Sequence, residues 1–289
     1  MKPLTTTMPS TPPTVLITGC SDHGIGSSLA HAFHSHGYHI YACVRAVSQI
    51  TSLCTLQNID ILALDVTSPS QIQSAIDSIR EKGRGLDILV NNAGRNHFSP
   101  VLDVDIEEAR RLYEVNVWGP LRLIKACVPL LREGREKGKD GKGVGGMVVN
   151  VTSIAGHLNV PFMGLYSSSK AALELLTETL RLELQPFNIK VLSLVTGAVR
   201  SQGQSYFENY KLPPDSLYLP IENTIAERAR GNDGHPREDT AVYAESVVRD
   251  VLKGREGKVW HGAGAGGMKW MLQVLPGGMM GDVLGVRFG

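Results

Sequence analysis

The sequence predicts an α/β protein, with a doubly wound parallel sheet of about seven strands and helices on both faces, in a single domain. Short apolar runs alternate with segments of helical period from residue 14 to residue 262, and parallel strands require such crossover helices. The 289 residues, 42% of them hydrophobic, are enough for one large core. The first apolar run leads into a glycine-rich turn and then a helical pattern, as the first βα unit of this fold class does.

Seven strands are predicted because seven short apolar runs are bounded by turn residues. Continuous hydrophobicity, as in the first run TVLIT, is typical of strands that are buried on both faces. In chain order the predicted strands are 14–18, 39–44, 61–64, 86–90, 147–151, 189–195 and a short last strand at 258–260.

Five helices are predicted from apolar residues that recur every three or four positions. The first, at 25–36, carries Ile25, Leu29 and Phe33 on one face. The third, at 106–131, is long and should either bend near Gly119 or end before Pro129, because proline removes a backbone donor inside a helix. The other three helices are predicted at 70–82, 168–184 and 240–252.

Four segments lack these patterns. Residues 1–13 are rich in Thr and Pro, without the apolar stretch of a secretory signal, and are expected to form a mobile tail. Residues 133–146 are charged and glycine-rich, which predicts a surface loop. The irregular stretch 196–238 is interpreted as a substrate loop or lid, because so long an irregular stretch in a compact domain usually has a function. Residues 263–289 form an apolar C-terminal tail.

Charge and cysteine usage exclude several classes of partner. With 29 Lys and Arg against 28 Asp and Glu, the net charge of +1 argues against nucleic acid and against membrane binding by bulk electrostatics. The four cysteines are far apart in the sequence, which predicts free thiols and a cytoplasmic location. No metal site is predicted, because the spacing of His31, His34 and His36 does not place three imidazoles on one helix face.

The glycine-rich turn predicts a dinucleotide site. Glycines there let the chain turn tightly and let its backbone approach a pyrophosphate at the N-terminus of the next helix. The position of the turn in the chain supports this interpretation, because it follows the first predicted strand and precedes a predicted helix. The residues predicted to contact the cofactor here are Gly19, Ser21, His23, Gly24, Ile25 and Gly26.

The end of the second strand indicates which cofactor binds. An Asp or Glu at this point would hold a ribose 2′-hydroxyl, whereas an arginine accommodates a 2′-phosphate. The strand ends at Arg45 with no acid nearby, and a guanidinium suits the geometry of phosphate. NADPH is therefore predicted, and NADH is the less favoured cofactor.

Further motifs across residues 14–255 resemble those of the short-chain dehydrogenase/reductase family. They include Asn91-Asn92-Ala93-Gly94 and the Tyr166-x-x-x-Lys170 pair with a serine 13 residues upstream. The resemblance implies a Rossmann-type fold and a nicotinamide-dependent oxidoreductase. It places Asn116, Ser153, Tyr166 and Lys170 at the catalytic site, with Tyr166 and Lys170 also touching the cofactor, and Asp65, Val66, Asn92, Ala93 and Gly94 at the cofactor.

Physical chemistry supports the catalytic roles that this resemblance implies. Tyr166 and Lys170 are four residues apart on a predicted helix, so both project from one face. Tyrosine ordinarily has a pKa of about 10, and an ammonium that lowers it by about three units contributes about 4 kcal/mol. Ser153 would donate a hydrogen bond to the substrate oxygen, and Lys170 would also hold the nicotinamide ribose. Asn116 would hold a water that relays protons.

The glycine-rich turn departs from the commonest family pattern. Four residues separate Gly19 from Gly24, where three are commoner. This spacing resembles that of fungal reductases similar to 1-acyldihydroxyacetone-phosphate reductase. His23 would then lie either near the adenosine phosphate or in solvent.

A second departure follows the sixth strand. Thr196-Gly197 stands where the family usually has Pro-Gly, and threonine lacks the fixed φ of proline. Gly197, the Val199 backbone and the Ser201 hydroxyl are still expected to reach the nicotinamide carboxamide, with looser preorganisation.

The predicted substrate pocket lies over the carboxyl ends of the strands. Its predicted lining is largely apolar or aromatic, which favours a ketone on a hydrophobic substrate over a sugar or a small acid. Two substrates are considered: 1-acyldihydroxyacetone phosphate in lipid synthesis, and a polyketide, terpenoid or steroid-like ketone in a specialised pathway. A different function, that of a low-turnover NADPH-binding scaffold or sensor, is the remaining alternative. For Arg228 and Arg230 a solvated helix face is favoured over contact with a substrate phosphate. The predicted lining is His97, Phe98, His157, Leu158, Phe162, Tyr206 and Phe207.

The apolar tail carries predictions about partners. Residues 268–288 are too apolar to leave in water and too interrupted, by Pro276 and by charged residues, to span a bilayer. We expect the tail to pack on protein, either at the substrate mouth or in the interface of a homodimer or homotetramer, which the family commonly forms. Peripheral contact with a lipid surface, at the endoplasmic reticulum or lipid droplets, is the alternative.

Overall fold

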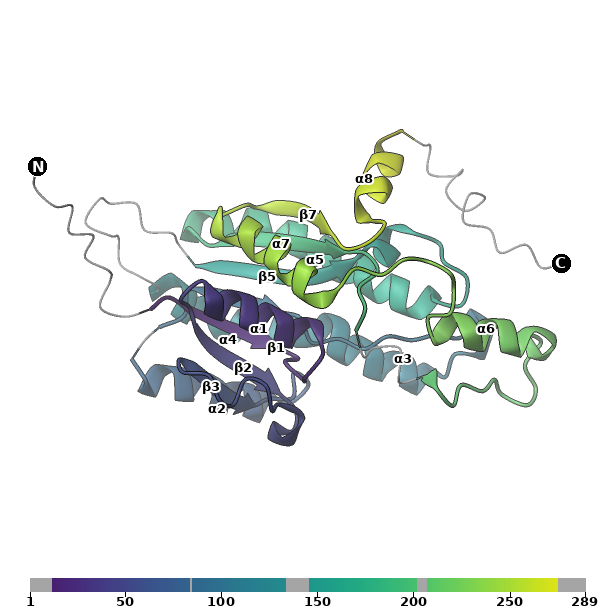
Figure 1. Ribbon diagram of the computed structural model, residues 1–289, viewed down its shortest axis with the longest axis horizontal. Coiled ribbons are helices and arrows are strands. Elements are labelled where there is room, and N and C mark those ends of the chain that lie inside the picture. The colour runs from purple at the N-terminus through teal and green to yellow at the C-terminus, as the bar shows by residue number, and fades with distance from the viewer. Residues whose placement is uncertain (1–11, 84, 134–145, 202–206, 275–289) are drawn as a thin grey trace, which may run out of the picture.

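The computed structural model describes residues 12–83, 85–133, 146–201 and 207–274. Seven strands form one parallel sheet in the order β3-β2-β1-β4-β5-β6-β7 (Figure 1). The predicted doubly wound fold is therefore confirmed. The strands are β1 (Thr14–Thr18), β2 (His39–Val44), β3 (Ile59–Ala63), β4 (Ile88–Asn91), β5 (Met147–Ser153), β6 (Lys190–Thr196) and β7 (Gly257–His261).

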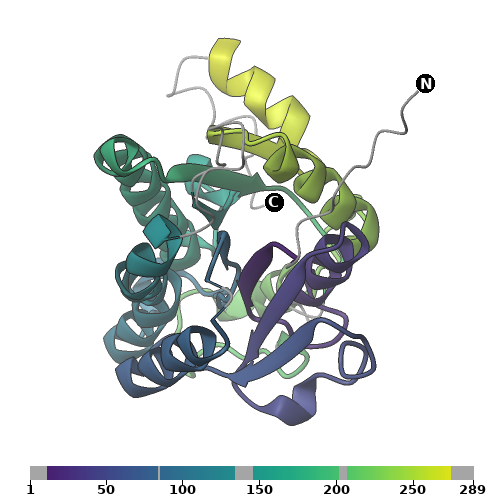
Figure 2. The ribbon, with the colours of Figure 1, turned by 90° about the vertical axis from the view of Figure 1, so that its left-hand side faces the viewer.

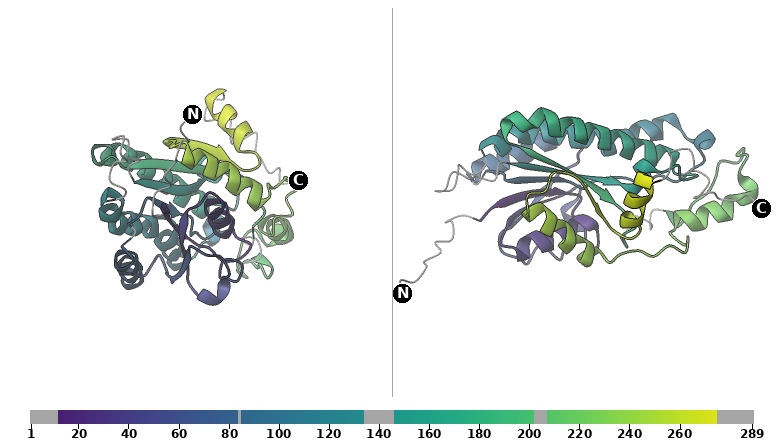
Figure 3. Two further views of the ribbon diagram at one scale, coloured as in Figure 1. Left: turned by 60° about the vertical axis from the view of Figure 1, so that its left-hand side comes forward. Right: turned by 90° about the horizontal axis from the view of Figure 1, so that it is seen from above.

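Helices cover both faces of the sheet, so the molecule has three layers (Figure 3). One face is covered by α1 (Ile25–Ser35) and α7 (Thr240–Leu252), which pack against each other. The opposite face is covered by α2 (Pro69–Glu81), α4 (Gly119–Glu133) and α5 (Gly164–Leu184). The predictions for residues 1–11, for the loop at 134–145 and for the tail at 275–289 fall outside the described residues.

Neighbouring residues of each central strand enter opposite layers of the core, because side chains alternate across a strand. In β1, Val15 and Ile17 join the layer beneath α1 and α7, whereas Leu16 joins the layer beneath α2 and α4. All three side chains are fully buried. Burying each of them contributes about 1.5–3 kcal/mol. A shift of one residue would exchange the two layers, so this pattern fixes the register of the strand.

The carboxyl ends of the strands meet along one edge of the sheet. Strand order reverses between β1 and β4, which are adjacent. The loops after these two strands therefore leave toward opposite faces and create a crevice. This edge carries the glycine-rich turn after β1, the Asn-Asn-Ala-Gly segment after β4 and Ser153 at the end of β5.

The predicted helix 106–131 is divided. It consists of α3 (Ile106–Tyr113) and α4, joined by a π-helical turn at Glu114–Trp118. Of the two predicted alternatives, the bend near Gly119 is confirmed and the end before Pro129 is wrong. The helix runs through Pro129 because Cys127 and Leu130, on either side, are buried in the core. This packing outweighs the cost of proline inside a helix, which is about 3 kcal/mol.

Two further segments differ from prediction. The helix predicted at 168–184 begins at Gly164, which brings Tyr166 into its first turn. The stretch 196–238, interpreted as an irregular substrate loop or lid, contains a short helix, α6 (Glu222–Ala229), at the segment where a helix face was favoured for Arg228 and Arg230. Eight residues are too few for a helical period to stand out in a sequence. The helix forms because Ile225 and Ala229 bury themselves against the aromatic cluster around Phe98.

The described part of the C-terminal tail forms α8 (Ala265–Val274), which stands beside β7 (Figure 2). Met268 is buried and packs with Leu158, whereas Trp270 is 63% exposed. Through Met268, the start of α8 packs on the protein itself. None of the helices within the described ranges is both long enough and apolar enough to cross a membrane.

Candidate active site

The glycine-rich turn after β1 allows the close backbone approach that a dinucleotide needs. Gly19 has a φ of +74°, in the left-handed region that favours glycine. A Cβ on Gly26 would lie 2.3 Å from the Gly19 carbonyl oxygen, so no side chain fits there. Helix α1 begins at Ile25 with no acidic residue in its first turn and no side-chain cap at Gly24. Its first N–H groups are therefore oriented for a pyrophosphate, and these residues fit the cofactor.

Asn92 and Ala93 hold this turn in place from the neighbouring strand. The Thr18 hydroxyl accepts hydrogen bonds from the N–H groups of both residues, each at 3.0 Å. The Asn92 side-chain amide donates in return to the carbonyl oxygens of Thr18 and Gly19, at 2.8 and 3.2 Å. The crevice between β1 and β4 is thus fixed by reciprocal bonds.

Asp22 is a residue that sequence reasoning missed. Its carboxylate accepts bonds from the backbone N–H and the hydroxyl of both Thr51 and Ser52, at 2.5–3.2 Å. Burial opposes the shift, but these hydrogen bonds lower the pKa of Asp22 to about 2. The turn is thereby tied to the segment after β2. Its partners are about 30 residues away in the sequence, so no local pattern reveals the contact.

The remaining predicted cofactor residues lie in the turn after β1 and at the ends of β2 and β3. Arg45 is exposed directly after β2, and His23 is exposed with a φ of +59°. Asp65 shapes the turn after β3, because its carboxylate accepts bonds from the Thr67 N–H at 2.8 Å and the Thr67 hydroxyl at 2.7 Å. Val66 is buried beneath Gly119. The carbonyl of Ser21 accepts a bond from Gly24 at 3.1 Å and closes the turn.

Ser153, Tyr166 and Lys170 line one cavity at the carboxyl edge of the sheet. Ser153 ends β5, and its hydroxyl oxygen accepts a bond from the Ala155 N–H at 3.1 Å. Tyr166 and Lys170 come from the first turns of α5, with Lys170 Nζ 5.9 Å from the centre of the Tyr166 ring. Lys170 Nζ donates to the Val151 carbonyl at 2.8 Å. The predicted convergence of these three residues is what the structure shows.

Burial sets the protonation of this group. Burial raises the pKa of Tyr166, and a hydrogen bond with Ser153 opposes the rise. Burial also lowers the pKa of Lys170 to about 8, because the charged ammonium loses water. In the protein without cofactor, Tyr166 is therefore held as a neutral phenol, able to donate a proton, and Lys170 is charged below a pH of about 8.

We predict that reductive kcat/KM stays level through neutral pH and falls above a pH of about 8. Lysine is charged when protonated, so Lys170 loses the charge that stabilises a developing phenolate as the pH rises through its pKa, while Tyr166 remains protonated. The measurement is a pH–rate profile of the wild type and of Lys170→Arg, whose side chain stays charged throughout. An identical falling limb in both proteins would contradict the assignment.

Asn116 is placed by an unusual piece of helix. It lies in the π-helical turn Glu114–Trp118, and such turns are frequent at functional sites. Its amide makes a reciprocal pair with the Arg95 backbone, accepting from the N–H at 2.8 Å and donating to the carbonyl at 2.9 Å. It also donates to Ser169 Oγ at 3.0 Å, and that hydroxyl donates to the Tyr166 carbonyl at 2.7 Å.

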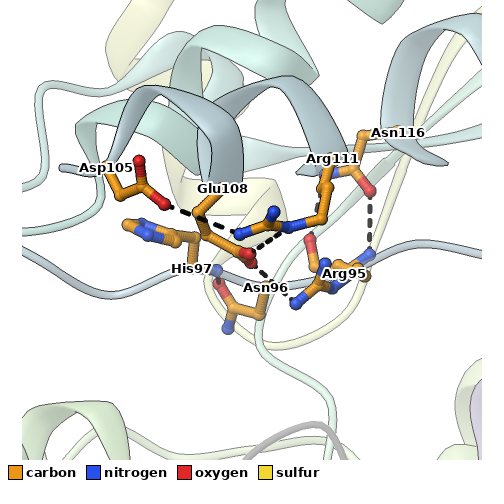
Figure 4. A network of polar contacts seen from close by, with 7 residues as sticks. All are labelled: Arg95, Asn96, His97, Asp105, Glu108, Arg111 and Asn116. Carbon is orange, nitrogen blue, oxygen red and sulfur yellow. Dashed lines mark hydrogen bonds and ion pairs between the residues drawn. The ribbon is translucent and has the colours of Figure 1, made fainter. Parts of the chain in front are cut away.

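An ion-pair network supports this arrangement (Figure 4). The Arg95 guanidinium binds one oxygen of Glu108 at 2.7 Å, and Arg111 binds the other at 2.8 Å. Arg111 also lies 3.6 Å from the Asp105 carboxylate. The loop that carries Arg95 is thereby fastened to α3, and so is the backbone that holds Asn116.

The cavity has a volume of about 560 Å³ and a largely apolar wall. Of the predicted substrate residues, Phe98 and Leu158 line it, together with Ala155, Met163 and Met268. Tyr206 lies outside the described residues. On the cofactor side the lining includes Ile25, Asn92, Gly94, Gly197, Val199 and Ser201.

The structure corrects the predicted role of four other pocket residues, which are absent from the described lining. Phe162 and Phe207 pack beneath α6, in the aromatic cluster that supports the wall. His97 is half-buried beside Arg95 and Glu108, and burial lowers its pKa. His157 faces away from the cavity wall, 3.4 Å from the Glu174 carboxylate and stacked on Trp260.

Glu174 organises a buried polar cluster behind the catalytic residues. It lies one helical turn beyond Lys170 and binds Lys258 Nζ at 2.7 Å. The Ser193 hydroxyl donates to its second oxygen at 3.1 Å. Burial alone would raise its pKa, but the bonds to His157 and Lys258 outweigh burial and lower the pKa to about 2. This cluster explains why His157 is drawn away from the substrate.

The structure gives a reason for Thr196 at the position of the usual proline. Its hydroxyl forms a 2.7 Å hydrogen bond with the Tyr243 hydroxyl, which anchors the end of β6 to α7. The next residue, Gly197, donates its N–H to the His261 carbonyl at 2.8 Å. A Cβ on Gly197 would lie 2.3 Å from the Ala263 carbonyl oxygen. Hydrogen bonds to neighbouring elements thus replace the rigidity of a proline ring.

We predict that Met268→Ala shifts selectivity toward bulkier ketones by about tenfold, because a few methylene groups removed from a pocket wall change binding by about 1–3 kcal/mol. Met268 is buried and lines the cavity. The measurement is kcat/KM for a slim and a bulky ketone. Met271→Ala is the matched control, since Met271 belongs to the same apolar cluster without lining the cavity. Equal selectivity in all three proteins would show that α8 is not a wall of the site.

The chain is similar to known proteins over most of its length. A family model described as short chain dehydrogenase matches residues 13–210. The chain is 46% identical over 264 residues to the short-chain dehydrogenase ptmH of Penicillium ochrochloron, covering 91% of this chain and 93% of that protein. It is 35% identical over 218 residues to an NADPH-dependent 1-acyldihydroxyacetone phosphate reductase of Schizosaccharomyces pombe, covering 74% and 70% of the two chains.

A solved structure extends the likeness to the whole fold. A short chain dehydrogenase from Burkholderia cenocepacia, in complex with NADP, superposes with a TM-score of 0.73 at 26% identity. The match covers 96% of this chain and 99% of that one.

Proposed function

The chain belongs to the short-chain dehydrogenase family, and from this premise we propose that it reduces a ketone on a hydrophobic substrate to a secondary alcohol with NADPH. One observation supports the proposal most strongly. Ser153, Tyr166 and Lys170 meet on a single cavity whose other walls are largely apolar. A proton donor and a hydrogen-bond donor therefore lie where the oxygen of an apolar carbonyl compound would dock.

The residues of this chain divide the work of reduction among them. NADPH supplies the hydride when it is bound. Ser153 donates a hydrogen bond that holds the carbonyl oxygen, and Tyr166 gives that oxygen its proton. Lys170, charged at neutral pH and 5.9 Å from the Tyr166 ring, stabilises the negative charge left on the phenol. Asn116, through Ser169, fixes the turn of α5 that presents Tyr166.

Two kinds of observation support NADPH over NADH. Arg45 follows β2 with no acid at the strand end that could hold a ribose 2′-hydroxyl. The reductase of Schizosaccharomyces pombe is named as NADPH-dependent, and the structure from Burkholderia cenocepacia holds NADP. The tether from Asp22 to Thr51 and Ser52 fixes the loop beside Arg45 and adds a preformed edge to this subsite.

The substrate within this class is proposed from the cavity wall. A largely apolar wall accepts an extended or polycyclic carbonyl compound better than a sugar. The reductase relative supports an acyl-chain substrate with a phosphate group. The polyketide, terpenoid or steroid-like ketones fit the apolar wall without requiring a charged group.

Partners and location are proposed from exposed side chains and from the free cysteines. Leu175, Leu182 and Phe187, on and after α5, are 49–71% exposed, which supports a homodimer or homotetramer through this face. Exposed Trp270 on α8 supports a peripheral lipid contact. The four free cysteines support a cytoplasmic protein, at the surface of the endoplasmic reticulum or lipid droplets where the lipid contact is made.

The proposed reaction is tested by following oxidation of NADPH by the pure protein with a panel of hydrophobic ketones, and with glucose and pyruvate for comparison. We expect turnover with the hydrophobic ketones, and slower turnover when NADH replaces NADPH. NADPH binding without turnover of any panel member would instead indicate the scaffold or sensor function.

A further inference from the structure

The cavity carries more positive charge than its own acid neutralises. Four cationic side chains line it, and Asp233 is the one acid among its described lining residues. Asp233 is already paired with Arg237, at 2.9 Å. Arg95 is paired with Glu108. Lys170 belongs to the reaction site. The remaining cation, Arg228, therefore stands apart from the other three.

Arg228 has no polar partner among the residues that the structure describes. Its neighbour Arg230, in contrast, has two polar partners. Arg230 binds the Glu227 carboxylate at 2.6 Å and the Glu208 carbonyl at 3.1 Å. The Arg230 side chain therefore fastens this part of the chain, whereas the Arg228 guanidinium takes no part in the hydrogen bonds among the described residues.

The fold of α6 points Arg228 toward the cavity. Ile225, one turn before Arg228, is fully buried. Ala229, the residue after Arg228, is also buried and lines the cavity. Arg228 is half-buried on this same side of the helix. Cations near a helix C-terminus interact favourably with the helix dipole, but that interaction does not require a place in the cavity wall.

A half-buried guanidinium against apolar walls has lost part of its water without gaining a partner. Guanidinium groups bind carboxylate and phosphate through two parallel hydrogen bonds, and such bonds strengthen where water is excluded. The arrangement therefore favours a ligand that brings an anion to Arg228 and an apolar body to the wall.

We infer that Arg228 forms an anion-binding subsite of the substrate cavity. It binds a carboxylate or phosphate monoester that the substrate carries at a distance from the ketone reduced at Tyr166. The inference rests on the proposed function and narrows it: the substrate is an amphiphilic keto compound with an apolar body and a remote anionic group. Arg228 is thus a specificity-determining residue, contrary to the solvated role that its sequence context favours.

Matched ligands test this subsite. 9-Oxodecanoate, its methyl ester and 2-decanone share the same chain and the same methyl ketone, and only the first is charged. 9-Oxodecyl phosphate distinguishes a phosphate subsite from a carboxylate one. The proteins are the wild type, Arg228→Gln, Arg228→Lys and the control Arg230→Gln. The readouts are kcat/KM with NADPH, Kd for NADPH, and calorimetric binding of decanoate and methyl decanoate, which contain no ketone, in the presence of NADP+.

For the wild type and the control we expect at least one anionic ketone to exceed the methyl ester by about tenfold or more in kcat/KM. This advantage should fall to within about twofold in Arg228→Gln and survive in part in Arg228→Lys, with Kd for NADPH unchanged. An equal kcat/KM for acid, phosphate and ester in the wild type would overturn the inference. So would an advantage that persists in Arg228→Gln, or a loss of NADPH affinity in that variant, which would assign Arg228 to the cofactor.

The calorimetric measurement distinguishes a failure of the anion subsite from a failure of the proposed reaction. The subsite is supported if decanoate binds more tightly than its ester to the wild type and this difference is lost in Arg228→Gln. If no ketone is turned over in that case, only the proposed reaction fails. Turnover of neutral ketones without any preference for anions retains the reaction and removes the subsite.

Discussion

Tyr166→Phe is expected to lower ketone reduction by about 10²- to 10⁴-fold, which is the contribution of a positioned proton donor. The phenol lies in the first turn of α5, half-buried on the cavity and hydrogen-bonded with Ser153. Burial keeps it protonated, so it is the group in the site that can give a proton to the carbonyl oxygen at neutral pH. Phenylalanine keeps the ring and its packing and removes only the hydroxyl.

The control for this experiment is cofactor affinity. The Tyr166 hydroxyl faces the reaction centre, whereas the glycine-rich turn and Arg45 lie toward the other end of the crevice, so Kd for NADPH should change less than about twofold. The measurement pairs single-turnover rates with fluorescence titration of NADPH. Turnover like that of the wild type would remove Tyr166 from the mechanism, and loss of NADPH binding would mean that the variant acts through the cofactor site.

Arg45→Ala is expected to weaken NADPH binding by about tenfold or more and to leave NADH binding nearly unchanged. A hydrogen bond to a charged group contributes about 1.5–3 kcal/mol, and only NADPH carries the 2′-phosphate that would receive it. Arg45 is exposed directly after β2, so its loss removes no packing from the core. The measurement is the ratio of the two dissociation constants.

A matched control comes from Arg249→Ala. Arg249 is also exposed, but it lies in the last turn of α7, at the edge of the sheet opposite the strand ends that carry the site. It should leave both dissociation constants unchanged. Equal losses for NADPH and NADH in Arg45→Ala would give Arg45 a structural role and leave the cofactor preference without its main support.

The sequence predicted the sheet well because strands buried on both faces leave continuous apolar runs that nothing else in the chain imitates. Long-range packing decided the elements that it predicted poorly. Pro129 stays inside α4 because Cys127 and Leu130 hold both sides of it in the core. The helix α6 forms on an aromatic cluster that includes Phe98 and Phe162 from distant parts of the sequence, so its own eight residues carry little signal.

The candidate site likewise contains residues that could be predicted from the sequence and residues that could not. Tyr166, Lys170 and Ser153 were predictable because their spacing and their place after strands fix where they project. Asp22 and Glu174 were not, because each acts through partners far away in the sequence. His157 was assigned to the pocket by its position between Ser153 and Tyr166, and a buried carboxylate on α5 redirects it. Electrostatic partners of this kind become visible only in three dimensions.

The most direct test of the account is hydride transfer itself. Wild-type protein is incubated with 9-oxodecanoate or 2-decanone and with NADPH that carries deuterium at both positions of C4 of the nicotinamide, and the product alcohol is examined by mass spectrometry. We expect deuterium on the carbinol carbon, and labelled alcohol to form about 10²- to 10⁴-fold more slowly with Tyr166→Phe. Tight binding of NADPH with no deuterated alcohol from these or any other hydrophobic ketone would contradict it.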